Sequence, residues 1–334
     1  MIFDILVGLQ HGDEGKGKVV HHLFKSNKYT HCVRFNGGPN AGHTIYHKGN
    51  KLVLHQIPVG IIWGVDCVIG PGCVVNLKKL DEEILYLQEN GISNINKNLF
   101  IAHNAHVILD EYIDEDNKTD TIGSTGEGIK PAYANKYKKI GTRIEDIHEL
   151  KDKFNVINTS TFLNKPDNYI LFEGAQGYML DIDWGDYPYV TSSHCLSYGA
   201  LSCGVPMQHI DKIYGICKIY DTYVGNKKFQ DPNDTFLQEL AKEGNEFGAT
   251  TGRPRQCGWL DLPKLKQAIV SNGITNLIIN KCDIIKIVNT FRLYDGKGLR
   301  SFVNYEDMCT FIRDSLRECD FLKEVVFSAS PNKI

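Results

Sequence analysis

The chain has 334 residues, with 37 Lys and Arg against 40 Asp and Glu, which gives a formal net charge of −3. Its 42% hydrophobic and 23% charged residues are typical of a globular protein and exclude disordered, collagen-like and coiled-coil chains. The small net charge also argues against broad nucleic-acid binding, which requires a basic excess. This length suits one large domain, and we expect a single domain over residues 1–334.

No apolar stretch reaches the roughly 20 residues that cross a bilayer, and Met1-Ile2-Phe3-Asp4 lacks the charged and apolar regions of a signal peptide. We therefore expect a cytoplasmic protein, in the host cytoplasm if the source is viral, with no membrane or nucleic-acid partner. The ten cysteines form no C-x-x-C pair, so the sequence indicates reduced thiols and neither a zinc site nor a redox motif.

Strand and helix patterns alternate along the chain, because short apolar runs are followed by segments with apolar residues at three- and four-residue steps. In chain order, the patterns predict a strand at Ile5–Leu9, a helix at Lys16–Phe24, strands at Cys32–Phe35 and Asp66–Ile69, a helix at Leu77–Gln88, strands at Tyr169–Phe172 and Lys212–Ile219, helices at Thr235–Lys242 and Leu262–Ser271, a strand at Asn276–Ile279, a helix at Glu306–Arg317 and a strand at Glu324–Phe327. The alternation predicts an α/β fold with a mainly parallel central sheet, flanking helices and long functional loops. The polar, Gly-rich segment Asp114–Lys139 is expected to be the most loop-like.

A glycine-rich loop joins the first predicted strand to the first predicted helix and reads Gly12-Asp13-Glu14-Gly15-Lys16-Gly17-Lys18. Its glycines let the backbone approach a phosphate, the following helix offers free N–H groups, and the lysines add positive charge. The loop therefore predicts a P-loop-like phosphate site, although it fits neither G-x-x-x-x-G-K-[ST] nor G-x-G-x-x-G. A glycine-rich turn without a ligand is the alternative.

A second motif follows the strand predicted at Asn276–Ile279 and reads Asn280-Lys281-Cys282-Asp283. An N-K-x-D tetrad at a strand end is typical of guanine binding, because the carboxylate accepts hydrogen bonds from the ring N–H and the 2-amino group, which adenine does not offer. The tetrad alone is weak evidence, since these four residues are common. Together with the upstream phosphate loop, it indicates GTP.

Two further loops carry groups suited to an anionic substrate. The segment Gly248-Ala249-Thr250-Thr251-Gly252-Arg253-Pro254-Arg255 combines amides, hydroxyls and guanidinium groups that can bind a carboxylate, although arginine-rich turns are often only solvated surface. In the segment Asn36–Thr44, His43 lies among Gly and Asn residues, where an imidazole has few packing partners and can act as an acid near neutral pH.

Taken together, these motifs match those of a known family. The chain resembles the adenylosuccinate synthetase family through six blocks in the family's order: Gly12–Lys18, Asn40–Thr44, Gly123–Gly126, Phe172–Gly177, Tyr187–Ser193 and Asn245–Arg253. The blocks extend over nearly the whole chain, so the resemblance is specific.

The resemblance implies a Mg²⁺-dependent, GTP-driven ligase that joins the amine of L-aspartate to C6 of a 6-oxopurine nucleotide, usually IMP. Asp13 is implied as the general base for purine N1 and, with the Gly42 carbonyl, as a Mg²⁺ ligand. Deprotonation would let O6 attack the γ-phosphate of GTP and form a 6-phosphoryl intermediate. His43 is implied as the acid at the transferred phosphoryl group and Gln176 as a donor to O6. Aspartate then displaces phosphate to give adenylosuccinate, as in purine biosynthesis.

The resemblance also implies two sets of binding residues. Those expected to bind GTP and its metal ion are Gly12, Asp13, Glu14, Gly15, Lys16, Gly17, Lys18, Gly42, His43, Thr44, Arg255, Lys281, Cys282, Asp283, Ser328, Ala329 and Ser330. Those expected to bind the purine nucleotide and aspartate are Asn40, Ala41, Thr125, Lys139, Gln176, Thr191, Ala249, Thr250, Thr251, Gly252, Arg253 and Arg255. Lys139 is expected to reach the neighbouring site of a homodimer, and the sequence leaves ATP and dATP open as energy donors.

Several positions depart from the family's pattern. Glu127 stands where bacterial members carry an arginine between two glycines, and Lys139 stands in place of the arginine that crosses to the partner subunit. Pro254 and Gln256 replace two arginines near the aspartate site. The segment His194–Tyr198 has larger side chains than usual and is expected to alter the wall of the purine-nucleotide pocket.

These departures leave dGMP open as the acceptor, as in phage relatives that make N6-succino-2-amino-2′-deoxyadenylate for modified DNA. In that branch the catalytic aspartate is often replaced by a smaller residue, so the retained Asp13 favours IMP. A GTP-binding switch is a second class, but it predicts the standard P-loop and has no use for Gln176 or Thr250–Arg255. An inactive relative is a third, and the retained catalytic and binding residues argue against it.

Overall fold

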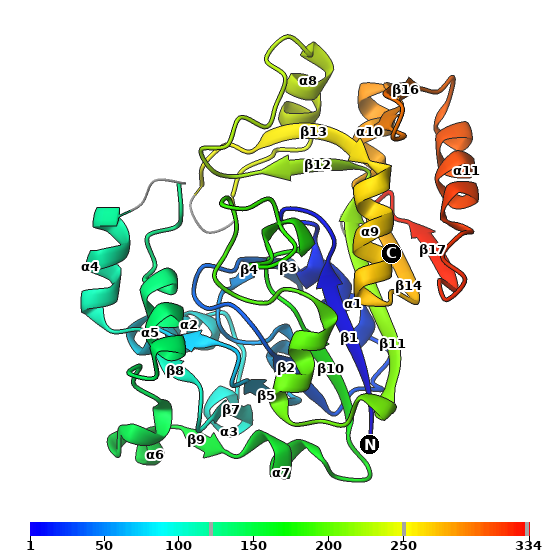
Figure 1. Ribbon diagram of the computed structural model, residues 1–334. Helices are drawn as coiled ribbons and strands as arrows, with labels where there is room; N and C mark the ends of the chain where they lie inside the picture. Colours follow the sequence, from blue (N-terminus) through cyan, green and yellow to red (C-terminus); the bar gives the residue numbers. More distant parts are fainter. Residues whose placement is uncertain (120–122, 249–251, 331–333) are drawn as a thin grey trace.

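A nine-stranded sheet forms the centre of the protein in a computed structural model, which describes residues 1–119, 123–248, 252–330 and 334. Every neighbouring pair of strands is parallel, in the order β17-β14-β11-β1-β10-β2-β5-β7-β9 (Figure 1). The strands are β1 (Ile2–Gly8), β2 (His31–Arg34), β5 (Asp66–Ile69), β7 (Leu99–Ala102), β9 (Asn155–Ile157), β10 (Tyr169–Glu173), β11 (Ile210–Lys218), β14 (Asn276–Asn280) and β17 (Glu324–Phe327). The predicted α/β fold with a mainly parallel sheet is confirmed.

Side chains of the central strands alternate between two apolar cores, one on each face of the sheet. In β1, Phe3, Ile5 and Val7 pack into one core and Leu6 packs into the other, and all four are buried. Burial on both faces requires a nearly continuous apolar run, which explains why the central strands can be predicted from the sequence. The sequence patterns do not predict the edge strand β9 or its neighbour β7, both of which are short.

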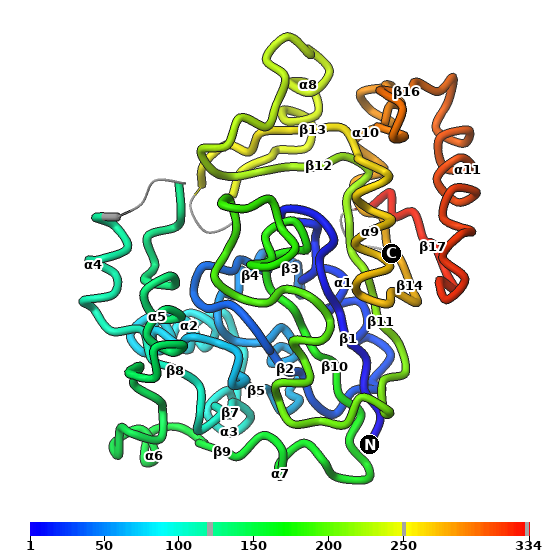
Figure 2. Tube along the Cα trace, in the orientation of Figure 1, coloured from blue at the N-terminus to red at the C-terminus, as the bar shows by residue number. Residues whose placement is uncertain are grey.

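Helices cover both faces of the sheet. They are α1 (Lys16–Phe24), α2 (Leu77–Glu89), α3 (Ile95–Asn98), α4 (Asp110–Thr119), α5 (Ile129–Lys138), α6 (Glu149–Lys153), α7 (Thr159–Leu163), α8 (Thr235–Glu243), α9 (Leu262–Asn272), α10 (Cys282–Val288) and α11 (Tyr305–Leu316). Apolar side chains of α1 and α2 join one core, and those of α9 and α11 join the other. The tube in Figure 2 shows the C-terminal third, yellow to red, beside β1 and β11.

Smaller sheets and short helical turns surround this layer. A four-stranded sheet consists of β12 (Tyr220–Tyr223), β13 (Gln256–Asp261), β15 (Arg292–Tyr294) and β16 (Leu299–Ser301), and two pairs consist of β3 (His43–His47) with β4 (Asn50–Leu54) and β6 (Val74–Val75) with β8 (His106–Val107). The short 3₁₀ helices are η1 (Val59–Trp63), η2 (Ile144–Asp146), η3 (Tyr178–Leu180), η4 (Ser197–Cys203) and η5 (Met207–His209).

The prediction of a loop over Asp114–Lys139 is wrong for much of that segment. α4 extends through Asp114 to Thr119, and α5 occupies Ile129–Lys138. The two helices and neighbouring strands share a small apolar cluster that includes Tyr112 and Tyr133. Tertiary packing therefore stabilises helices that the polar, Gly-containing sequence did not indicate.

All ten cysteines are buried and free of disulfide bonds. Within the described residues, no helix combines the length and the apolar character that a membrane span requires.

Candidate active site

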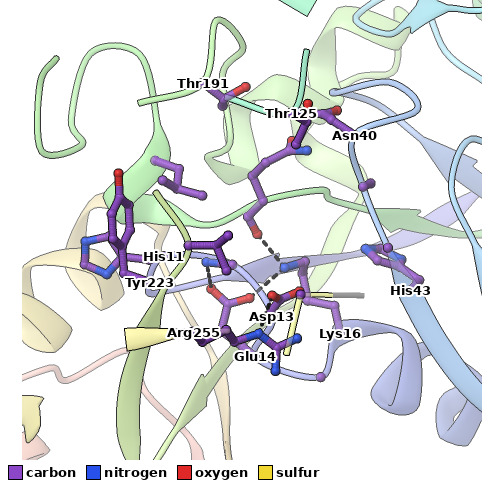
Figure 3. Close-up of a pocket in the computed structure, with 18 of the residues that line it drawn as sticks. His11, Asp13, Glu14, Lys16, Asn40, His43, Thr125, Thr191, Tyr223 and Arg255 are labelled. Carbon is purple, nitrogen blue, oxygen red and sulfur yellow. Dashed lines mark hydrogen bonds and ion pairs between the residues drawn. The ribbon is translucent and has the colours of Figure 1, made fainter. Parts of the chain in front are cut away.

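A cavity of about 1000 Å³ lies at the carboxyl ends of the central strands. The loops that follow β1, β2, β10, β11 and β14 all contribute to its lining. Parallel strands bring their carboxyl ends to one edge of a sheet, so motifs that are far apart in the sequence meet there. Figure 3 shows labelled residues from these loops directed toward a common space.

The loop after β1 is stabilised by hydrogen bonds to the side chain of one of its own residues, Glu14. Glu14 is buried and accepts hydrogen bonds from the backbone N–H groups of Gln10 (3.1 Å) and Gly12 (3.0 Å). It also pairs with the ammonium group of Lys16 at 2.6 Å, and Lys16 donates a further hydrogen bond to the backbone carbonyl of Gln176. The Glu14 side chain therefore stabilises the loop from within, beneath the cavity.

Two glycines of this loop are required by its geometry. Gly15, the residue before α1, has φ of 88°, in the left-handed region that favours glycine. At Gly17, a Cβ atom would lie 3.0 Å from the Cβ of His43, closer than two such atoms normally approach. A larger residue at position 17 would therefore displace β3 from α1.

The tetrad after β14 is joined to the phosphate loop by hydrogen bonds. The amide of Asn280 donates to the carbonyl of Glu14 at 2.7 Å, and its oxygen accepts from Lys18 at 3.0 Å. Lys18 also donates to the hydroxyl of Ser328 (2.7 Å) and the carbonyl of Ser330 (2.6 Å). Burial lowers the pKa of Lys18 to about 8. The two predicted GTP motifs therefore form one structural unit.

His43 lies at the start of β3 with its imidazole buried against the last residue of β10. Its Nδ1 donates to the carboxylate of Glu173, and its Nε2 has no hydrogen-bond partner among the described residues. Burial, assisted by the nearby cations Arg34 and Lys16, lowers the pKa of His43. Burial opposes ionisation of Glu173, but His43 and Arg34 keep the pKa of that carboxyl low. The unliganded imidazole is therefore neutral, with Nε2 available to a ligand.

Gln176 follows β10 in a left-handed conformation, with φ of 56°. Its side-chain oxygen is buried and unpaired within the part of the chain that the structure describes. A buried polar atom without a partner is costly unless a ligand or water binds it, so this amide is suited to contact a bound molecule.

Asp13 and Arg255 lie close together in Figure 3. The Nε of Arg255 donates to Asp13 at 2.7 Å, and its terminal nitrogen pairs with the buried carboxylate of Glu246. Glu246 also faces Lys218 at 3.7 Å and Lys281 at 3.4 Å. Burial opposes ionisation of Glu246, but these three cations hold its pKa at about 2.

A separate group of polar residues lies at the other end of the cavity, where Figure 3 shows Asn40, Thr125 and Thr191 close together. Asn40 accepts from the backbone N–H of Gly38, and the backbone N–H of Thr191 donates to the carbonyl of Leu180. Arg253 donates to the carbonyl of Gly123 at 3.0 Å and so contacts the loop that carries Thr125.

Residues 5–165 and 149–308 match the sequence model described as adenylosuccinate synthetase. The chain belongs to the adenylosuccinate synthetase family. Its reaction class is therefore that of a ligase driven by GTP, with aspartate as the amine donor.

Individual relatives agree with this assignment. The adenylosuccinate synthetases of Cytophaga hutchinsonii and Chlorobaculum tepidum are each 40% identical to this chain, over 93% and 89% of it and 84% and 81% of their own lengths. The solved structure of fully ligated adenylosuccinate synthetase from Plasmodium falciparum has a TM-score of 0.85 at 27% identity, over 99% of this chain and 98% of that one. Succinoaminodeoxyadenylate synthetase of cyanophage S-2L, solved with dGMP and dATP, has a TM-score of 0.78 over 99% and 93%, and at 23% identity it shows the fold alone.

Most of the residues predicted from the family's motifs meet in the cavity. Those that line it are Gly12, Asp13, Glu14, Gly15, Lys16, Gly17, Lys18, Asn40, Ala41, Gly42, His43, Thr44, Thr125, Gln176, Thr191, Arg253, Arg255, Lys281, Asp283 and Ser330. Ala249, Thr250 and Thr251 lie outside the described residues.

Five predicted residues do not line the cavity: Lys139, Gly252, Cys282, Ser328 and Ala329. Cys282 is buried in the apolar core, and Ser328 contributes indirectly by accepting a hydrogen bond from Lys18. Lys139 is exposed at the end of α5, so in a single chain it does not reach the cavity.

The expectation that His194–Tyr198 alters the pocket wall is wrong. The lining stops at Ser192, and the backbone then turns inward, where the N–H of Cys195 donates to buried Asp181 at 2.6 Å. The hydroxyl of Tyr198 contacts the His194 ring at 2.9 Å, outside the cavity. This departure from the family's pattern therefore does not reshape the pocket.

Sequence reasoning missed three buried charged residues that shape the site. Glu173 and Glu246 lie inside the quoted blocks but were given no role, although a buried acid beside a glycine motif is a usable signal. His11 lies between Asp221 (2.8 Å) and Asp186 (3.1 Å). Burial opposes its charge, but these carboxylates raise the pKa of His11 to about 9. Because its partners are 175 and 210 residues away in sequence, only the fold reveals this contact.

Proposed function

We propose that the protein joins L-aspartate to C6 of IMP, with GTP as the energy source, and releases adenylosuccinate, GDP and phosphate. The observation that carries this proposal is the meeting of Asp13, His43 and Gln176 in one cavity with Lys281, Asp283 and Arg255. A binding-only protein has no use for an acid, a base and an amide around one reacting centre.

Asp13 acts in the first step as the general base. It removes the N1 proton of the purine, and the resulting charge on O6 lets that oxygen attack the γ-phosphorus of GTP, with GDP as the leaving group. The hydrogen bond of 2.7 Å from Arg255 supports this role, because it fixes the direction of the Asp13 carboxylate.

His43 stabilises the phosphoryl group during transfer. Its imidazole is neutral before ligands bind, with Nδ1 donating to Glu173. The negative charge of a γ-phosphate next to Nε2 favours protonation of that nitrogen, which can then donate to a phosphoryl oxygen. Glu173 compensates the imidazolium charge in the same way that a buried carboxylate supports a catalytic histidine.

Gln176 and the arginine segment act in the second step. The Gln176 amide donates to O6 as negative charge develops there, and the amine of aspartate attacks C6 and expels O6 as part of inorganic phosphate. Arg253 and Arg255, with Thr250 and Thr251, bind the carboxylates of aspartate, since guanidinium groups match carboxylate geometry.

GTP lies along the unit formed by the phosphate loop and the tetrad. Lys16 and Lys18 contact its phosphates, Lys281 and Asp283 contact guanine, and Ser330, which lines the cavity, lies over the base. This placement of GTP is supported by the hydrogen bonds of Lys18 to Asn280 and Ser330, because they join the phosphate loop to the residues proposed to surround the base.

Asp13 and Gly42 have the donors that Mg²⁺ prefers, a carboxylate and a backbone carbonyl, and both line the cavity. They would hold the ion together with phosphate oxygens. When bound, Mg²⁺ neutralises negative charge on the phosphates of GTP.

The 5′-phosphate of the acceptor binds at the end of the cavity that holds Asn40, Thr125 and Thr191. A homodimer completes this end, with Lys139 from the second copy. Two large apolar side chains near Lys139, Tyr137 and Ile140, are 64% and 70% exposed, which supports a covered surface there.

The acceptor is tested by measuring phosphate release with Mg²⁺, GTP and aspartate while IMP, dIMP, GMP and dGMP are supplied in turn. Turnover dominated by IMP is expected, since Asp13 is retained and His194–Tyr198 does not line the cavity. Turnover dominated by dGMP would instead assign the enzyme to the synthesis of a 2-aminoadenine nucleotide. Repeating the series with ATP and dATP tests the energy donor.

A further inference from the structure

His11 is a buried side chain at the cavity to which the mechanism above gives no role. Its side chain is 2% exposed, and it precedes Gly12 and Asp13. Its Nδ1 lies 2.8 Å from a carboxylate oxygen of Asp221, and its Nε2 lies 3.1 Å from one of Asp186. The ring therefore bridges two carboxylates from distant parts of the chain, with one nitrogen facing each of them.

The two carboxylates come from separate segments that also line the cavity. Asp186 directly precedes the segment Tyr187–Ser192, all of which borders the cavity. Asp221 belongs to β12, which leads into Tyr223 and Val224 on another side of the same space. One imidazole ring therefore links the loop that carries Asp13 to two other parts of the lining, and Figure 3 shows His11 beside Tyr223.

The surroundings of His11 fix its orientation. The rings of Tyr223 and Phe229 meet it edge-on, with centroids 5.5 Å and 5.0 Å away. Asp186 also pairs with Lys227 and, at 3.4 Å, with Lys264 at the start of α9. Removing the imidazole would therefore leave Asp186 with two cations.

Asp221 depends more strongly on His11. Apart from the His11 ring, its carboxylate accepts a hydrogen bond from the backbone N–H of Thr222 at 2.7 Å. A partly buried carboxylate that loses its cation tends to move toward water. Loss of the imidazole would therefore loosen the Asp221 side chain more than that of Asp186, while β12 keeps its pairing with β13.

We propose that His11 is a positioning residue that holds the 186–192 segment and β12 against the Asp13 loop, and so sets the position of the acceptor nucleotide relative to Asp13. This inference rests on the proposed function for the roles of Asp13 and Thr191. The GTP end is held by different contacts, those of Asn280 with Glu14 and Lys18. Loss of the His11 contacts should therefore weaken acceptor binding selectively.

The test compares His11→Ala and His11→Gln with the unmodified full-length protein. Calorimetry measures the Kd of IMP and, separately, of GDP, and steady-state kinetics gives the KM of each substrate. The IMP Kd and KM are expected to rise roughly tenfold to a hundredfold, the range for lost hydrogen bonds between charged groups. The GDP Kd is expected to change by less than about twofold, because the hydrogen bonds of the His11 side chain go to Asp186 and Asp221 and not to Glu14, Lys18 or Asn280.

A paired substitution separates positioning from simple loss of structure. In His11→Gln with Asp221→Asn, the new amide at position 221 can donate to the Gln oxygen and re-form a neutral link to β12. IMP binding should recover partly compared with His11→Gln alone. His103→Gln is the matched control, since His103 also pairs with a carboxylate, Glu145 at 2.9 Å, but lies outside the cavity.

The outcomes distinguish this inference from the proposed function. Folded His11 variants with an unchanged IMP Kd and KM would overturn the positioning role, and so would an equal loss of IMP and GDP binding. An unmodified protein that binds IMP but joins no aspartate to it would contradict the proposed function. The effect of His11 on IMP binding would then still be measurable.

Discussion

The two ends of the cavity are built differently. At the catalytic end, Lys18 and His43 are held by the last residues of the central strands β14 and β10, and Asp13 is held by Arg255, which directly precedes β13. At the acceptor end, Thr125 and Thr191 are half-buried on loops, and Lys139 is exposed and outside the cavity. The comparison teaches that strand ends of the central sheet and one arginine fix the reacting groups, whereas acceptor binding depends on loops, on the His11 contacts and on a proposed second copy.

The largest effect is expected from Asp13→Asn, which keeps the shape and the acceptor oxygen for Arg255 but removes the base. The kcat should fall by about a hundredfold to ten-thousandfold, the usual contribution of general acid–base catalysis. GTP binding should persist, because the phosphate loop is held by Glu14. An exposed substitution, Asp167→Asn, serves as the control, and near-normal turnover in Asp13→Asn would falsify the assigned base.

A smaller effect, confined to the GTP part of the catalytic end, is expected from Asp283→Asn. The KM for GTP should rise by roughly tenfold or more, the effect of losing hydrogen bonds to a charged group, while the KM for aspartate stays unchanged. XTP should become a better substrate for the variant, because its 2-oxo group accepts the hydrogen bond that the new amide donates. Equal losses with GTP and XTP would contradict a guanine contact by Asp283.

A modest effect at the acceptor end is expected from Lys139→Ala, with Lys138→Ala as the neighbouring control. Loss of one cation near a phosphate should raise the KM for IMP about threefold to tenfold, without changing the KM for GTP. Because the cation is proposed to come from a second copy, specific activity of the unmodified protein should fall on dilution below the dimer's Kd. If activity per chain is independent of concentration and the two lysine variants behave alike, a single chain forms the whole site.

The smallest effect concerns stability at the catalytic end. Lys218, Lys281 and Arg255 hold the pKa of buried Glu246 at about 2, below the ordinary value of 4.5, although burial opposes this. A lowered folded-state pKa contributes stability above pH 4.5, and this contribution is lost as the pH falls toward 2. It should amount to on the order of 1–3 kcal/mol. Urea unfolding of the protein and of Glu246→Gln checks this, since the variant should lack that part of the pH dependence.

The sequence predicted the catalytic end well for a physical reason. β1, β10 and β14 are buried on both faces and read as apolar runs, and the motifs follow them directly. In a parallel sheet, strand ends share one edge, so motifs that are separate in the sequence can be assigned to one site from their positions after the strands. Asp13, Gln176 and Asp283 accordingly line one cavity.

The acceptor end was less predictable because its geometry depends on tertiary contacts. α4 and α5 are stabilised by a small apolar cluster that cannot be predicted from their polar sequence. The segment after Ser192 turns away from the cavity because Cys195 donates a hydrogen bond to buried Asp181. The contacts of His11 with Asp186 and Asp221 join residues with no common motif. Such contacts can be identified only once the three-dimensional structure is known.

The most direct test of the central claim follows the oxygen at C6. IMP labelled with ¹⁸O at position 6 is incubated with the protein, Mg²⁺, GTP and aspartate, and the released phosphate is examined by mass spectrometry. Transfer of the phosphoryl group to O6 before aspartate attacks predicts one ¹⁸O atom in each released phosphate. Unlabelled phosphate, formed alongside adenylosuccinate, would contradict a 6-phosphoryl intermediate and with it the roles assigned to Asp13 and His43.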